Sequence, residues 1–176
     1  MFRPHWATYR WNLKSLPSEA PRHLVKSTEL RTATEDDAAA IWGAMERSFA
    51  SEQAWGMQLL DRVRLLRKTV YDGLKEKKVQ FLVIEHGRRI IAGSGLISDS
   101  ESPLHLATGV WVMEEYRCRG LGKFLLHASL KHLSGAGLEE AVVVTRSNTA
   151  GAKYLYPKFE SVAGKVEDFP ELKELD

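Results

Sequence analysis

The sequence predicts one mixed α/β domain, and three observations support this prediction. Stretches with the alternating or fully apolar pattern of β-strands are interspersed with stretches of helical period. The 176 residues, of which 44% are hydrophobic and 27% charged, are enough for a substantial core. No internal repeat or low-complexity tract interrupts the pattern. We therefore expect strands grouped into a sheet that helices cover.

Residues 1–28 are predicted to be an arm appended to a domain of residues 29–176. In HWATYRWNL (5–13) apolar and polar residues alternate as in a strand, and two prolines in LPSEAP (16–21) then break the chain. The arm holds five basic residues and one acidic residue. We expect it to close a sheet edge. Covering the site and swapping onto a partner subunit are the alternatives.

A strand, two helices and a hairpin are predicted next. TELRTAT (28–34) is typical of a strand, and Thr34 can cap a helix whose first turn is acidic. In GMQLLDRVRLLRKTVYDGLKEKK (56–78), apolar residues three and four apart predict an amphipathic helix. VQFLVIEHGRRIIAGSGLIS (79–98) has two β-rich runs around a turn, which predicts a hairpin.

The second half of the chain is predicted to continue as strand, helix, strand and helix. LHLATGVWV (104–112) is typical of a strand, and a helix then runs through about Leu133, where SGAG ends it. AVVVTR (141–146) is almost wholly apolar, as in a buried central strand. SNTAGAKYLYPKF (147–159) begins a short helix that Pro157 ends.

Glycines stand at the start of a helix in EEYRCRGLGKFLLHASL (114–130). A Walker A loop is excluded because Arg117 stands at its first glycine and Phe124 at its hydroxyl residue. A Rossmann loop is excluded because Leu125 stands at its third glycine. The pattern that remains is R-x-x-G-x-G at residues 117–122.

This pattern resembles the pyrophosphate loop of the GNAT N-acetyltransferases, a superfamily that uses acetyl-CoA. Free amides and the dipole at a helix N-terminus favour a phosphate, and glycine lets the backbone approach it. A glycine-loosened turn with solvated arginines is the alternative for these six residues alone. The resemblance extends over about residues 28–162 in the order of elements. It implies a central, mostly antiparallel twisted sheet of six to seven strands with about four flanking helices.

The resemblance also implies site residues. The backbone of residues 110–112 would pair with pantetheine and stabilise the oxyanion, and the glycine loop would hold the pyrophosphate. Asn148 begins a segment similar to the family's asparagine-to-tyrosine segment, with helix capping as its alternative role. No metal site is expected. The implied cofactor-binding residues are Val110, Trp111, Val112, Arg117, Cys118, Arg119, Gly120, Leu121, Gly122, Lys123 and Asn148.

Two tyrosines compete for the family's catalytic role, which is to stabilise the leaving thiolate. Aligning Tyr156 leaves Asn148 eight residues earlier, one more than is usual in the family. Aligning Tyr154 places Ser147 at the asparagine position. The two side chains are about 200° apart on an α-helix, so only one can face the cofactor. We favour Tyr156, and core packing is the alternative for either tyrosine.

The sequence departs from the family at three places. Glu114 replaces the usual proline before the loop, and the closing Gly-Phe is absent when Tyr156 is aligned. The position that carries a glutamate base in some members is best matched by Leu106. Nearby candidates for the base, none of which is favoured over the others, are His105, Glu85, Asp99 and Glu101.

The implied reaction is direct transfer of the acetyl group of acetyl-CoA to a primary amine on a small molecule or peptide. A ping-pong mechanism through Cys118 is rejected because the phosphate loop lies away from the thioester. Residues 43–62 would form the acceptor side, where Phe49, Trp55 and Met57 are apolar and Glu52 can attract an amine. Core packing is the favoured reading of these apolar residues. A catalytically inactive acyl-CoA-binding sensor or interaction module is the alternative function.

Composition also bears on nucleic-acid binding, membrane association and cellular location. A net charge of +2 is too small to favour nucleic acid or an anionic membrane. One cysteine excludes an intramolecular disulfide, and the chain has neither a signal-peptide pattern nor an apolar run of about 20 residues. We expect a cytoplasmic monomer or homodimer. A transit peptide is the weaker reading of the basic N-terminus.

Overall fold

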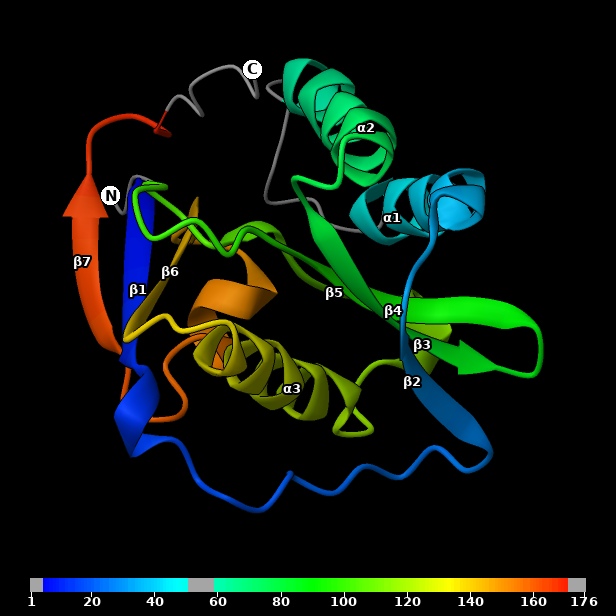
Figure 1. Ribbon diagram of the computed structural model, residues 1–176, viewed down its shortest axis with the longest axis horizontal. Coiled ribbons are helices and arrows are strands. Elements are labelled where there is room, and N and C mark those ends of the chain that lie inside the picture. Colours follow the sequence, from blue (N-terminus) through cyan, green and yellow to red (C-terminus); the bar gives the residue numbers. More distant parts are fainter. Residues whose placement is uncertain (1–4, 51–58, 171–176) are drawn as a thin grey trace.

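The computed structural model describes residues 5–50 and 59–170, which form the predicted mixed α+β fold (Figure 1). The described residues hold seven strands, all paired antiparallel, three α-helices, a π-helical turn and three short 3₁₀ helices at Leu13–Ser15, Glu35–Asp37 and Glu114–Tyr116. The strands are β1 (Trp6–Asn12), β2 (Thr28–Thr32), β3 (Gln80–His86), β4 (Arg89–Leu96), β5 (Leu106–Val112), β6 (Glu140–Arg146) and β7 (Val162–Val166). The α-helices are α1 (Ala38–Ala50), α2 (Leu59–Lys75) and α3 (Leu121–Gly135), and the π-helical turn is Gly151–Leu155.

The strands form two sheets, ordered β2-β3-β4-β5 and β6-β1-β7. Strand β1, from the predicted arm, is the middle strand of the second sheet, so the expectation that it closes an edge was wrong. Its alternation predicts a half-buried strand but does not identify its neighbours, which come from the far end of the chain. Strand β6 is buried as expected but lies at the edge of its sheet, and β7 was not predicted. The division of the chain at residue 28 stays a prediction.

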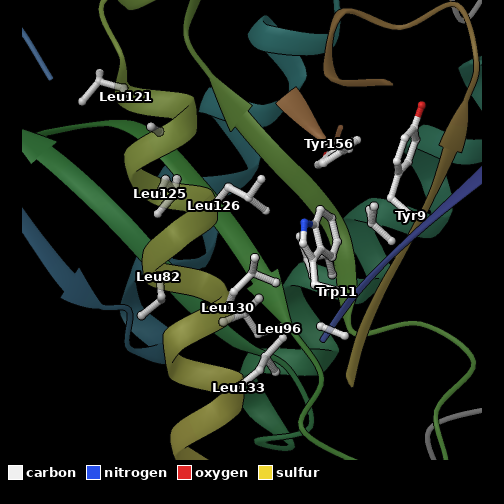
Figure 2. Close-up of a cluster of buried hydrophobic side chains, with 14 of the residues drawn as sticks. Tyr9, Trp11, Leu82, Leu96, Leu121, Leu125, Leu126, Leu130, Leu133 and Tyr156 are labelled. Carbon is white, nitrogen blue, oxygen red and sulfur yellow. The ribbon is translucent and has the colours of Figure 1, made fainter. Parts of the chain in front are cut away.

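Helices cover both faces of the four-stranded sheet (Figure 1). Phe81 and Val83 of β3 face the core that α1 and α2 help to form, whereas Leu82 and Ile84 face α3. This opposition follows from the two-residue repeat of a strand. Five leucines of α3 are buried in the core on the Leu82 and Ile84 face of the sheet. Trp11 of β1 is buried in the same core (Figure 2). The five leucines are Leu121, Leu125, Leu126, Leu130 and Leu133.

Strands β5 and β6 meet at one end and then diverge. His105, just before β5, donates its backbone N–H to the Val142 carbonyl at 2.8 Å, and its Nδ1 accepts the Val142 N–H at 3.1 Å. Within the described ranges no strand pairs with the outer edge of β5. The π-helical turn fills part of the gap (Figure 1), and the Tyr156 hydroxyl that follows it accepts the Val110 N–H of β5.

Candidate active site

A cavity of about 460 Å³ lies between the diverging strands. Its walls are β5, the glycine loop with the start of α3, and the segment Thr149–Lys158, while Ser48, Phe49 and Leu66 close it from α1 and α2. Most of the residues predicted to bind cofactor or act in catalysis line it, but Arg119 and Asn148 do not. Those that line it are Val110, Trp111, Val112, Arg117, Cys118, Gly120, Leu121, Gly122, Lys123, Tyr154 and Tyr156.

The glycine loop presents the N-terminus of α3 to the cavity. Gly120 is the residue before the helix, with φ at +87°, and no side chain caps the first turn. The first backbone N–H groups of a helix have no intrahelical acceptor, so this turn offers donors to an anion. Cys118 also has a positive φ, +61°, and its side chain is exposed.

The two glycines of the loop serve different needs. A Cβ atom at Gly120 would lie 2.9 Å from the carbonyl oxygen of Arg22, because the N-terminal linker crosses the loop there. The linker is fixed to the loop by a bond from the Leu24 N–H to the Arg119 carbonyl, at 2.8 Å. At Gly122 the nearest atom to an added Cβ is 3.7 Å away, on Leu155. A side chain at position 120 would therefore clash with the linker, so the fold requires glycine there. A side chain at position 122 fits and would reach into the cavity.

Arg117 faces the protein. Its Nε donates to the Val112 carbonyl at 3.0 Å, and one terminal nitrogen donates to both the carbonyl and Oγ of Ser48, at 3.0 and 3.1 Å. The guanidinium thus joins the end of β5 to the last turn of α1. Arg119, by contrast, lies over the ring of Tyr116, 5.9 Å from its centroid. Arg117 therefore shapes the loop through its hydrogen bonds.

The environments of the two candidate tyrosines differ sharply. Tyr154 is 73% exposed, whereas Tyr156 is 3% exposed. The Val110 N–H of β5 donates to the Tyr156 hydroxyl at 3.0 Å, so this phenol sits on one of the backbone amides expected to contact the acyl group. Burial raises the pKa of Tyr156 to about 12, which keeps its hydroxyl protonated at neutral pH.

A π-helical turn lies between Asn148 and Tyr156. The Tyr156 N–H bonds to the Gly151 carbonyl at 2.8 Å, five residues back instead of four. A π-turn accommodates one inserted residue without ending the helix. Thr149 caps the turn, because its Oγ1 accepts the Ala152 N–H at 3.2 Å. Asn148 does not make this cap, and its binding role stays a prediction.

None of the four candidate bases lines the cavity. His105 is 5% exposed at the closed end of β5, and burial lowers its pKa. Glu85 is paired with Arg31 at 2.6 Å. Among the described lining residues the charged side chains are all cationic, from Arg117, Lys123 and Lys158. Of the predicted acceptor side, Ser48 and Phe49 line the cavity, while Glu52, Trp55 and Met57 lie outside the described residues.

Residues 36–160 match the acetyltransferase (GNAT) family. Among curated proteins no match was found. In the described ranges there is no helix long and apolar enough to cross a membrane, and no group of three or more His, Cys, Asp or Glu side chains that could hold a metal.

Several solved structures share the fold. A Drosophila protein is 13% identical with a TM-score of 0.62, and the match covers 93% of this chain and 49% of that one. A GCN5-related N-acetyltransferase of Sphaerobacter thermophilus is 19% identical with a TM-score of 0.55, covering 93% and 50%. A predicted acetyltransferase of Clostridium acetobutylicum with acetyl-CoA is 15% identical with a TM-score of 0.53, covering 85% and 96%. The chain thus spans about half the length of the first two.

Proposed function

The chain belongs to the GNAT acetyltransferase family, and from this premise we propose that it transfers the acetyl group of acetyl-CoA to a primary amine by direct attack on the thioester. One observation carries the proposal. The Tyr156 hydroxyl rests on the Val110 amide inside a cavity that also reaches the glycine loop. This arrangement supports a hydrogen-bond donor for the leaving sulfur and a phosphate site along one cavity.

The residues present fit acetyl-CoA. The free amides of the first turn of α3 suit the pyrophosphate, and the missing side chain at Gly122 lets that group approach. Lys123 and Lys158 supply positive charge along the cavity. The outer edge of β5 can pair with the amides of pantetheine as an added strand would. The bound coenzyme would supply the activated thioester.

The chain's own groups then have defined tasks. The substrate nitrogen bonds to the acetyl carbon, the carbon–sulfur bond breaks, and the sulfur leaves as a thiolate while the nitrogen loses a proton. The Tyr156 hydroxyl donates a hydrogen bond to that thiolate and keeps its own proton, because burial holds its pKa at about 12. The Val110 N–H donates to the Tyr156 oxygen and holds this hydroxyl in place, so the oxyanion is assigned to the remaining backbone N–H groups of residues 110–112.

We assign the amine's proton to water, since no carboxylate or imidazole lines the described part of the cavity. An alkylamine has a pKa near 10.4, so the attacking neutral form is scarce at pH 7. With a free water acceptor, kcat/KM is expected to rise about tenfold per pH unit between pH 6 and pH 9. A plateau with an apparent pKa near 6 to 7 would instead indicate a protein base.

The decisive experiment is a release assay for the free thiol of CoA across classes of acceptor: arylalkylamines, polyamines, aminoglycosides and lysine peptides. At least one class should stimulate release, with the acetylated amine confirmed by mass. Tyr156→Phe should lower kcat roughly 10- to 100-fold and leave the KM for acetyl-CoA within about twofold. If acetyl-CoA binds but no class is acetylated, the chain is the alternative, a catalytically inactive acyl-CoA-binding module.

A further inference from the structure

The segment that carries Tyr156 is held in place by the N-terminal strand. We propose that Tyr9 and Trp11 are positioning residues, which fix Tyr156 against the Val110 amide through hydrogen bonds to the backbone on either side of it. The consequence for catalysis rests on the proposed role of Tyr156. The positioning itself does not.

Two hydrogen bonds from β1 bracket the tyrosine. The Tyr9 hydroxyl donates to the Ala152 carbonyl at 2.8 Å, four residues before Tyr156. The Trp11 indole N–H donates to the Lys158 carbonyl at 2.8 Å, two residues after it. The first bond is buried and joins residues 143 positions apart. The placement of the segment therefore depends on a strand from the opposite end of the sequence.

The aromatic rings of the same strand enclose Tyr156. The ring centroids of Tyr9 and Tyr156 are 5.8 Å apart, and those of Trp11 and Tyr156 are 6.1 Å apart with nearly perpendicular planes. Figure 2 shows the three side chains together beside the leucines of α3. Such edge-on and tilted contacts favour one orientation of the enclosed ring.

The other side of the Tyr156 ring has little free space. A Cβ atom at Gly109 would lie 2.5 Å from its hydroxyl oxygen, and one at Gly151 would lie 2.9 Å from its ring. The ring thus fills a slot between β5 and the π-turn, with the aromatic residues of β1 behind it. A small shift of the π-turn would break the 3.0 Å contact with Val110.

The π-turn explains why an outside donor is needed. In a π-turn the hydrogen-bond ladder is displaced by one residue, so the carbonyl pattern of an α-helix is locally interrupted. A buried carbonyl in such a place needs another donor. The Tyr9 hydroxyl supplies that donor to Ala152, and burial raises the pKa of Tyr9, so it remains an O–H at neutral pH.

The test compares Tyr9→Phe, which removes only the hydroxyl, with Tyr71→Phe on α2 as the matched control. Tyr71 is 36% exposed and lies outside the cavity lining. Trp11→Phe is the second variant, with the indole donor removed. Hydrogen–deuterium exchange of a peptide covering residues 151–158 reports on the segment whether or not the protein turns over. Steady-state kcat and the KM for acetyl-CoA report on catalysis.

Tyr9→Phe should speed exchange of these amides about fivefold, the equivalent of one net hydrogen bond, with no such change in Tyr71→Phe. It should also lower kcat about three- to tenfold with the KM for acetyl-CoA unchanged, and Trp11→Phe should act in the same direction. Unchanged exchange in Tyr9→Phe would overturn the positioning. Faster exchange with an unchanged kcat would overturn its link to catalysis. If the wild-type protein shows no turnover, only the proposed function is refuted. Hydrogen–deuterium exchange of residues 151–158 still tests whether Tyr9 holds the segment in place.

Discussion

At the scale of single residues, the proposed chemistry centres on Tyr156. Its hydroxyl accepts one backbone N–H and retains a proton of its own to donate. Tyr154, two residues earlier, is 73% exposed and has no comparable environment. The sequence narrows the choice to these two residues. It favours Tyr156, but the π-turn that places this residue against β5 cannot be predicted from the side-chain pattern.

Tyr156 should make stability depend on pH in the alkaline range. Its folded-state pKa of about 12 lies above the usual value of 10, so the folded protein holds this proton more tightly than the unfolded chain. The resulting stabilisation is complete below pH 10 and is lost as the pH rises toward 12. Urea unfolding should show a fall in the free energy of unfolding of about 2–3 kcal/mol from this group. Tyr156→Phe should lack that component, and identical pH profiles for the two proteins would contradict the assignment.

Arg117 illustrates what sequence spacing cannot convey. The R-x-x-G-x-G pattern correctly marks the loop, but the proximity of Ser48, 69 residues away along the chain, appears only in the fold. Because a lysine cannot reach both Val112 and Ser48, Arg117→Lys should lower the free energy of unfolding by about 1–2 kcal/mol. Thermal or urea unfolding measures this. Arg119→Lys in the same loop is the control and should change the free energy of unfolding by less than about 0.5 kcal/mol. Equal effects of the two substitutions would argue against a stabilising role for the Arg117 bonds to Val112 and Ser48.

At the scale of elements, the π-turn can accommodate the one extra residue that aligning Tyr156 with the family's tyrosine requires. The asparagine-to-tyrosine spacing is one residue longer than usual, and the turn places that extra residue without rotating Tyr156 away from β5. This explains why alignment on sequence alone left Tyr154 and Tyr156 in competition.

Deletion of the exposed Lys153 should therefore be tolerated. The π-turn would close to an α-turn, Tyr156 would keep its place, and the free energy of unfolding should change by less than about 1 kcal/mol. Deletion of Ala128 in the middle of α3 is the control, because it turns the buried leucines out of register and should unfold the protein. Chemical denaturation distinguishes the two. If both deletions unfold the chain, the turn is not an accommodated insertion.

The sequence predicted the elements in which apolar residues recur at a regular spacing, and it missed the strand that lacks such a spacing. The apolar spacing of α3 and the two β-rich runs of β3 and β4 marked those elements closely. Strand β7 was missed because four of its five residues are exposed, so it has no apolar face for a pattern to detect. Strand β1 was found, but its partners were not, because strand pairing is decided by long-range packing.

At the scale of the whole molecule, β1 forms one sheet with β6 and β7 from the far end of the chain. Strand β1 separates β6 from β7, with Trp11 fully buried and Tyr9 on the core side. The linker after it is fixed to α3 by a bond between His127 Nε2 and the Pro17 carbonyl at 2.7 Å. The arm thus supports both the tyrosine segment and the glycine loop.

Removal of residues 1–27 should accordingly abolish the fold. The truncation leaves β6 and β7 without the strand that joins them, and it removes Trp11 and Leu13 from the core. The loss should exceed about 5 kcal/mol, which is comparable to the whole stability of a domain of this size. Far-ultraviolet circular dichroism and near-ultraviolet fluorescence of the truncated chain provide the measurement. A cooperative unfolding transition in that chain would show that the arm is dispensable.

The central claim, that the cavity between β5 and β6 holds acetyl-CoA, is tested most directly by calorimetric titration of three proteins. The wild type should bind one acetyl-CoA per chain. Gly122→Glu adds a carboxylate where a side chain fits but faces the expected pyrophosphate, so its Kd should rise at least about tenfold. Gly135→Glu, at the opposite end of α3 with nothing within 4 Å of an added Cβ, should bind like the wild type. No saturable binding by the wild type, or equal Kd values for the wild type and Gly122→Glu, would contradict the claim.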